Sequence, residues 1–427
     1  MSNSFASNIT RKLAKVILKS FESKRVLSKN VNTQLLDGKF NPSSGDTVDF
    51  KRPTDYVSVR TSNGDVSGAT PSDIITGKAS GVVQDYFTAL VEFDEADQAI
   101  KMDQQKQLVE MPMIDRIVTD LELDYAGFMA KNTALMAGTF GTPATTWNHV
   151  AGGSAILEAS GVPKDGSWYY TINPFTQTNL ASNTVSLGAG GDAGKLVSDA
   201  YRSATIKENF AGMDVMTATT LSSYTTDSES DRVGALASNP DVTYLAAKDT
   251  MTQTLAVSGM GADLEVRAGE TITIAGRYRL NLRTRQPILD ENGSRILWSG
   301  TVTTAVTLSG TGTGNIVVTG PAIYESGGAY NTVDSAPVSG DVVTILGSAS
   351  SIYQPNLFWH KQAFSIGSVP MKKLYSTDTI ATTADGLQFR VSFGTGFLEN
   401  QQKIRVDLRP AYACLNPFFA GKGWGTA

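Results

Sequence analysis

The stretch that decides the fold runs from residue 113 to residue 136 and reads MIDRIVTDLELDYAGFMAKNTALM. Its apolar residues recur at helical spacing on one stripe, while the charged residues lie off that stripe. The stripe comprises Ile114, Ile117, Val118, Leu121, Tyr125, Phe128 and Leu135. Pro112 stands just before this stretch, where the start of a helix tolerates proline. At 1.5 Å per residue the predicted helix is about 36 Å long, a length suited to a structural spine.

An extended two-stranded arm is predicted on the N-terminal side of this helix. Residues 47–52 alternate as a strand that Pro53 ends, and a second strand is expected from Val82 to Phe93. Residues 53–81 are polar and glycine-rich, and so long an excursion is uncommon in a compact domain and tends to be functional. Because few of its apolar residues could anchor it to its own domain, we expect the arm, residues 51–85, to contact another protein. Its charges are interspersed in sign and comprise Lys51, Arg52, Asp55, Arg60, Asp65, Asp73 and Lys78.

Residues 1–30 form an amphipathic N-terminal segment with a basic face. Seven basic residues stand against one acidic residue, Glu22, and apolar residues from Ile9 to Phe21 recur at helical spacing. The pattern fits a helix on its own domain, a docking helix for a partner, a nucleic-acid-facing arm or a membrane-surface helix; the lack of a tryptophan anchor disfavours the membrane. We expect the segment to serve assembly more than folding. The residues expected to face a partner or DNA are Arg11, Lys12, Lys15 and Lys19.

Helices and strands alternate after the long helix, and the composition changes near residue 225. A helix is expected after Trp147, a strand over residues 168–172, and a further helix from Pro174. From 226 to 352 Thr, Val, Gly and Ser dominate, which predicts a small β-barrel domain inserted into the mixed one. Its strands are expected over residues 264–266, 271–274, 296–302, 315–318 and 342–346.

Two segments of this region echo each other in residue type. Residues 268–276 read AGETITIAG, and residues 339–347 read SGDVVTILG. Each predicts a turn at a glycine and an acid, followed by an alternating strand that ends at a glycine. Beyond the barrel, residues 387–393 and 404–408 alternate between apolar and polar, which predicts a hairpin with one buried face.

Composition excludes several classes of protein. The net charge of −5 argues against nucleic-acid binding over the whole surface, and no stretch offers the roughly 18 apolar residues of a membrane span. Basic residues interrupt the apolar pattern of the N-terminal segment, so we expect no signal peptide. Cys414 is the only cysteine, which rules out an internal disulfide and a multi-cysteine metal site.

Motifs that suggest chemistry fail on inspection. Residues 188–195 resemble a phosphate-binding loop, but Ala189 and Leu196 occupy positions that need glycine and Ser or Thr. Residues 227–232 begin like a calcium loop, but Arg232 stands where glycine is required. Only two histidines are present, His149 and His360. We therefore expect no enzyme and no catalytic, cofactor-binding or metal site.

The order of these elements resembles the major coat proteins of tailed bacteriophages, with the α+β fold of the Hong Kong 97 type. Within that family it is similar to the short-tailed-phage branch, which carries an inserted domain. The resemblance extends over nearly the whole chain. It rests on residues 45–53 (GDTVDFKRP), 116–122 (RIVTDLE), 355–359 (PNLFW) and 407–417 (DLRPAYACLNP).

The resemblance implies a domain for each part of the chain. Residues 1–30 would be the N-arm, residues 31–144 the peripheral domain with the E-loop at 51–85 and the spine helix at 113–136. The axial domain would comprise 145–225 and 353–385, the insertion domain 226–352, and the closing hairpin and tail 386–427. Loops of the insertion domain would bridge capsomers through Lys248, Asp249, Arg283, Arg285 and Asp290.

The function that the resemblance implies is self-assembly into hexamers and pentamers of an icosahedral phage head. The partners would be a scaffolding protein, a portal protein and packaged double-stranded DNA, bound without sequence specificity and without a membrane. The protein would assemble in the host cytoplasm and reside in the virion. Two rivals are another phage structural or adhesion protein, with the barrel as its binding module, and a hydrolase with an accessory β-domain. The long helix and polar arm argue against the first, and the lack of an active-site motif argues against the second.

Overall fold

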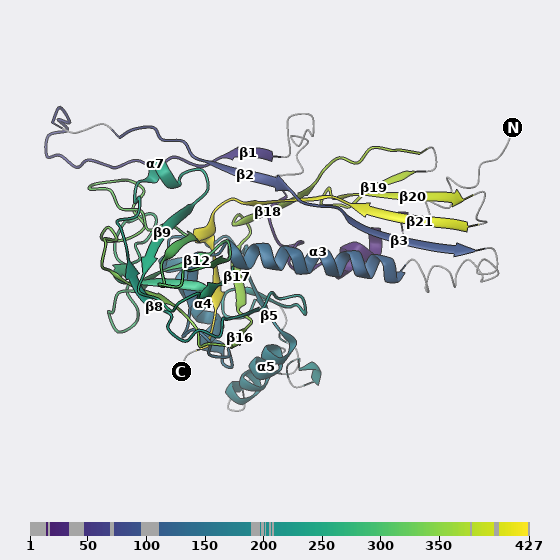
Figure 1. Cartoon of the computed structure of the whole chain (residues 1–427), viewed down its shortest axis with the longest axis horizontal. Helices are drawn as coiled ribbons and strands as arrows, with labels where there is room; N and C mark the ends of the chain where they lie inside the picture. The colour runs from purple at the N-terminus through teal and green to yellow at the C-terminus, as the bar shows by residue number, and fades with distance from the viewer. Residues whose placement is uncertain are drawn as a thin grey trace. The chain divides into compact units, whose positions relative to one another are not determined.

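The computed structural model describes residues 14–15, 18–33, 47–68, 72–94, 111–188, 197, 200, 202–204, 206, 209–375, 378–396 and 401–425. The chain divides into two compact units. The first comprises residues 1–48, 80–126 and 364–413, and the second comprises 49–79, 127–363 and 414–427. The chain has a few helices among many strands, and strands predominate after α5 (Pro174–Gly188) (Figure 1), which confirms the α+β class. Within the described ranges no helix has the length and apolar character needed to cross a membrane.

The first unit is built on a four-stranded antiparallel sheet. Its strands, in spatial order, are β19 (Thr379–Thr382), β20 (Gln388–Gly396), β21 (Gln401–Leu408) and β3 (Phe87–Asp94). β20 and β21 are the predicted hairpin, and they lie side by side with β3 in Figure 1. Phe389 and Val391 of β20 face Leu408 and Val406 of β21 and are fully buried, as the alternation predicts.

The second strand of the arm is divided, contrary to our prediction of one strand over 82–93. β2 (Lys78–Val83) ends before β3 begins, and the backbone N–H of Gln84 donates to Pro410 O at 2.9 Å between them. β2 pairs instead with β22 (Pro410–Cys414), with Val82 opposite Tyr412. One stretch of sequence therefore serves two sheets.

The long helix α3 (Met111–Lys131) ends five residues before the predicted end at 136. Leu135, which we placed on the helical stripe, lies in β4 (Leu135–Ala137). β4 pairs in parallel with β23 (Ala420–Gly423), and Leu135 lies opposite Gly421. Pairing with a strand distant in sequence overrides the helical spacing here. Most of the remaining stripe is confirmed, since Ile114, Ile117 and Leu121 are buried, whereas Phe128 is half-buried.

The second unit contains a five-stranded mixed sheet and a barrel. The sheet has the order β4, β23, β17 (Asn356–His360), β5 (Trp168–Ile172) and β6 (Asp214–Thr217). α4 (Trp147–Ala159) and α5 (Pro174–Gly188) begin where the sequence predicted helices. Trp168, Tyr170 and Phe358 are among the large residues of the core that the sheet shares with these helices.

The inserted barrel is closed by six strands. Its spatial order is β11 (Thr271–Tyr278), β12 (Leu297–Val302), β14 (Gly314–Thr319), β9 (Thr252–Ser258), β8 (Val233–Leu236) and β15 (Val342–Ile345). A separate short pair joins β10 (Glu265–Val266) to β13 (Val306–Thr307). Trp298, Ile272 and Val318 are among the residues of its own apolar core. The predicted β-barrel is thus confirmed, and its independence as a domain stays a prediction.

The two segments that echo each other in sequence become neighbouring strands of this barrel. β11 and β15 pair antiparallel, with Ile272 opposite Ile345. Gly269 and Gly340, which precede them, have φ angles of 95° and 91°. Both turns therefore use the left-handed backbone region that favours glycine.

Candidate functional site

The reactive side chains that the sequence singled out have structural roles. His149 Nδ1 accepts the backbone N–H groups of Thr145 and Thr146, at 2.8 and 3.1 Å, and so caps α4. His360 is buried, with Nε2 3.1 Å from Asp165 Oδ1. Burial raises the pKa of the Cys414 thiol to about 12, which leaves little thiolate at neutral pH. Among the described residues no group of His, Cys, Asp and Glu could hold a metal ion. The other candidate sites predicted from the sequence are surfaces: the arm, the barrel loops and the N-terminal segment.

The arm has an anchored base and an exposed tip. The base comprises residues 52–55 and 75–78, and the tip comprises residues 56–68 and 72–74. At the base Arg52 is only 8% exposed, and its Nε donates to Lys78 O at 3.0 Å while Nη1 donates to Leu415 O. Burial lowers the pKa of the Arg52 guanidinium. The base is thus held more firmly by its own unit than the polar sequence suggested.

The tip of the arm exposes apolar side chains that its own unit does not cover. Exposed fractions reach 74% at Ile74, and they exceed two-fifths at all members of the set. The set comprises Tyr56, Val57, Val59, Val66 and Ile74. Several large apolar residues exposed on one narrow segment are typical of a surface that becomes covered by a partner.

The seven charged residues predicted for intersubunit contact separate into two groups. Arg52, Asp55 and Lys78 lie at the base and are engaged within the chain: Asp55 Oδ2 lies 2.6 Å from Arg285 Nη2, and Lys78 Nζ lies 2.8 Å from Asp49 Oδ2. The remaining four are exposed and comprise Lys51, Arg60, Asp65 and Asp73. Lys78 is exposed as well, but it is already paired with Asp49, so the other four charges are the ones available for contact with another subunit.

The barrel-loop residues that the resemblance implies are also partly engaged within the chain. Lys248 and Asp249 form an ion pair at 2.9 Å, and Asp249 Oδ1 also accepts the backbone N–H of Lys78. Arg285 pairs with Asp55 of the arm. Arg283 and Asp290 are exposed.

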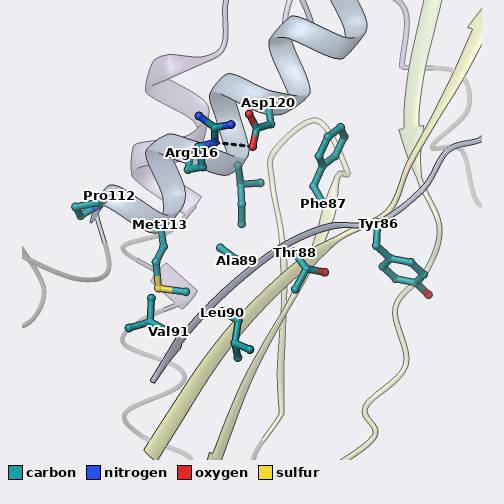
Figure 2. Close-up of a pocket in the computed structure, with 11 residues that line it drawn as sticks. Tyr86, Phe87, Thr88, Ala89, Leu90, Val91, Pro112, Met113, Arg116 and Asp120 are labelled. Atoms are coloured by element: carbon teal, nitrogen blue, oxygen red, sulfur yellow. Dashed lines mark hydrogen bonds and ion pairs between the residues drawn. The ribbon is translucent and has the colours of Figure 1, made fainter. Parts of the chain in front are cut away.

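A groove in the first unit was not predicted from the sequence. It has a volume of about 710 Å³, and Figure 2 shows it between β3 with the residues just before it and the first turns of α3. Exposed Leu90 and buried Met113 contribute to an apolar lining, with the Arg116–Asp120 ion pair at its edge, 2.9 Å long. The signal in the sequence was that Leu90 alternates with polar Thr88 and Glu92 on one face of the strand, but alternation alone does not reveal which face is left open.

The N-terminal segment is described only in part. Lys15 and Lys19 are exposed, as expected for a basic face, whereas Arg11 and Lys12 lie outside the described residues. Residues 18–24 are helical, and Phe21 is fully buried against Phe389 with ring centroids 4.4 Å apart.

Two basic side chains are buried at the barrel, which the sequence did not predict. Arg279 Nη2 donates to Ala134 O and Ser299 O, each at 2.7 Å, and burial lowers the pKa of Arg279 to about 10. Lys422 Nζ donates to Gly269 O at 2.5 Å, and burial lowers the pKa of Lys422 to about 7. Both hold the barrel to elements far away in the sequence.

Known proteins resemble the chain over its full length. The family model described as "P22 coat protein - gene protein 5" matches residues 1–425. A protein named "Major capsid protein" from Acyrthosiphon pisum secondary endosymbiont phage 1 is 34% identical over 432 residues, covering 100% of both chains.

Solved structures of phage proteins resemble it at low sequence identity. A Mycobacterium phage Che8 structure matches with a TM-score of 0.46 and 10% identity, covering 93% of this chain and 90% of that one. The capsid structure of cyanophage P-SCSP1u matches with a TM-score of 0.41 and 11% identity, covering 90% and 84%. The match of the family model and the full-length relative decide the assignment: this chain belongs to the P22 coat protein family.

Proposed function

We propose that this protein is the major capsid protein of a tailed phage, and that it forms hexamers and pentamers of an icosahedral shell. Full-length membership of the coat protein family is the observation that carries the proposal. The exposed apolar and charged tip of the arm supports it, because a subunit of a closed lattice needs surfaces that only neighbouring copies cover. The protein would then reside in the shell of the virion.

The finer parts of the proposal concern partners. The exposed side chains of Lys15 and Lys19 support contact of the N-terminal segment with a scaffolding protein or with the phosphates of packaged DNA. Assembly on that scaffold as a procapsid, maturation during DNA packaging and a portal protein at one vertex belong to the same proposal. We also propose that the protein has no catalytic activity, since the histidines and the cysteine are engaged in packing and capping.

Electron microscopy of the protein co-expressed with the scaffolding gene of its phage tests the proposal. We expect closed shells or tubular polyheads. Fibres or monodisperse monomers, from protein that is folded by circular dichroism, would contradict it and favour a tail or adhesion component with the barrel as a binding module.

A further inference from the structure

Loops of the barrel in the same chain contact the base of the arm through hydrogen bonds and an ion pair. The base has two legs, residues 52–55 and residues 75–78. On the first leg, the backbone N–H of Asp55 donates to Tyr330 Oη at 2.9 Å, and the Asp55 carboxylate pairs with Arg285 at 2.6 Å. On the second leg, Ile75 O accepts the Tyr330 hydroxyl at 3.3 Å, and the backbone N–H of Lys78 donates to Asp249 Oδ1 at 3.2 Å. The Tyr330 hydroxyl therefore bridges the two legs.

An apolar floor lies beneath these polar contacts. Ile75 packs against a buried cluster that includes Tyr244, Ala247 and Met251 from the loop that follows β8. Tyr244 stacks on Tyr330 with ring centroids 3.7 Å apart. In Figure 1 the arm passes α7 (Tyr244–Ala247), which belongs to this floor.

The arm and a barrel loop approach each other closely at Gly77. A Cβ atom added at Gly77 would lie 2.4 Å from Lys248 O, a distance that real side chains do not show. Glycine is therefore required for this leg of the arm to lie against the barrel loop.

Both barrel loops contain a residue with an unfavourable backbone. Met251 and Arg285 have φ angles of 53° and 56°, in the region where glycine is favoured and longer side chains are strained. Each nevertheless supplies a side chain to the arm base: Met251 joins the apolar floor and Arg285 pairs with Asp55. Glycine would relieve the backbone strain at Met251 and Arg285 but would remove the side chains that contact the arm. The retained strain therefore indicates that these contacts are needed.

We propose that Asp55, Asp249, Arg285 and Tyr330 form a clamp that sets the direction of the arm before subunits meet. They are positioning residues for subunit association, so the inference rests on the proposed shell-building function. It assigns Asp249 and Arg285 a role within the chain, distinct from the contact between capsomers that the resemblance implies.

The clamp is important for assembly because a small rotation at the base of the arm causes a large displacement of its tip. The chain from residue 55 to residue 64 can extend at most about 30 Å. A rotation of 10° at the base would displace the end of such a lever by about 5 Å, enough to lose the side-chain contacts that the tip makes with a neighbour. A pre-set direction also reduces the conformational entropy lost when the tip binds.

The test uses full-length protein and two readouts, amide hydrogen exchange in the unassembled subunit and the lowest protein concentration that gives shells with scaffold. Tyr330→Phe removes only the bridging hydroxyl. We expect exchange at Asp55 to rise about fivefold and the concentration threshold for shells to rise several-fold, with thermal unfolding unchanged. Arg285→Asp should act in the same direction, and adding Asp55→Arg should restore the pair and both readouts.

Arg283→Ala is the matched control for exchange, because Arg283 is exposed on the same loop and no described contact joins its side chain to the arm. Wild-type exchange at the arm base in Tyr330→Phe and Arg285→Asp would overturn the clamp. So would raised exchange with an unchanged shell threshold. If the wild-type protein forms no shells with its scaffold, the proposed function itself fails. The hydrogen-exchange data alone then report whether the clamp holds the arm base.

Discussion

At the scale of single residues, the buried lysine of the C-terminal strand is the least expected feature. Lys422 is 1% exposed, and all its described hydrogen-bond acceptors belong to the barrel: Gly269 O, Thr271 Oγ1 and Thr301 Oγ1. Glu270 lies nearby and is paired with Arg232 at 2.6 Å. A buried ammonium is tolerated only where several oxygens surround it, and the barrel provides them.

The pH dependence of stability should report this lysine. Its pKa is about 7 in the folded protein against an ordinary value of 10.5, so the unfolded chain binds more protons between these values. Stability should therefore rise with pH from about 7 toward 10 and be flat below 7 as far as this group is concerned. We expect a gain of about 2 kcal/mol between pH 7 and pH 9, measured by urea unfolding. Lys422→Met should lack that gain; an identical pH profile in the variant would contradict the assignment.

Histidine substitutions separate capping from catalysis. His149→Gln retains an acceptor for the Thr146 N–H, whereas His149→Ala should lose about 1 kcal/mol of stability. Because burial lowers the pKa of His149, the cap should weaken only as the pH falls below about 6.5. The His149→Gln, His360→Gln protein should still assemble if it folds. A folded double variant that cannot form shells would reinstate a role for histidine.

At the scale of elements, the N-terminal segment is partly a core element, which revises our expectation that it serves assembly more than folding. Glu122 of α3 accepts the backbone N–H of Leu27 at 2.7 Å, and Arg25 pairs with Asp385 at 2.9 Å. Phe21 packs edge-to-face on Phe389 of β20. Phe21 of the predicted apolar face therefore packs within the first unit, while Lys15 and Lys19 are exposed.

A pair of substitutions distinguishes the two faces of this segment. Phe21→Ala should destabilise the subunit by about 3–5 kcal/mol, the range for truncating a buried phenylalanine. Lys19→Glu should leave unfolding almost unchanged and reduce scaffold-directed assembly. Chemical denaturation and electron microscopy measure the two effects. A stable Phe21→Ala protein would return the whole segment to a role in assembly alone.

The element boundaries show where sequence reasoning succeeds and where it fails. Local patterns predicted four of the six barrel strands and missed β8 and β9. The two segments that echo each other, residues 268–276 and 339–347, contain β11 and β15, which pair with each other in the barrel. The end of α3 was wrong, since Leu135 fits the helical stripe but is captured by β23, almost 300 residues later. Local spacing cannot report a competing partner that distant in the chain.

The candidate site, like the element boundaries, was predicted from the sequence only in part. The arm was predicted from its composition, yet the burial of Arg52 depends on carbonyl oxygens at Lys78 and Leu415 that only folding brings together. The ion pair of Asp55 with Arg285 joins residues 230 positions apart, so charge alternation along the arm gave no sign of it. Exposure of the tip could be predicted, because its apolar residues follow no periodicity that would give the segment a buried face.

At the scale of the whole molecule, the charges of the arm tip should influence assembly and leave folding unaffected. Arg60 and Asp65 are exposed, and a single exposed ion pair contributes only about 0–1 kcal/mol. A closed lattice repeats each contact in every subunit, so a small loss multiplies. Arg60→Glu or Asp65→Lys should raise the concentration needed for assembly, and high salt should act in the same direction. Unchanged circular dichroism is the control; normal assembly of both variants at low salt would remove these charges from the contact.

The barrel offers a second test at this scale. Its apolar core consists of residues between Leu236 and Ile345, so residues 226–352 should fold alone. The isolated fragment should give dispersed amide signals by NMR. The spectrum of a disordered chain would show that the anchors outside the fragment, Ala134 and Lys422, are essential to the fold.

The way the chain enters and leaves the barrel has an evolutionary consequence. β7 (Tyr224–Thr225) pairs antiparallel with β16 (Ile352–Tyr353), and Thr225 lies opposite Ile352. A gene insertion at this point leaves its flanks as neighbours, and each doubling of the intervening length costs only about 0.6 kcal/mol of closure entropy. Phage lineages could therefore gain, lengthen or replace the barrel without disturbing the pairing of β7 with β16. A lineage that lost it, however, would leave the ammonium of Lys422 without its acceptors, so residue 422 should change in the same step.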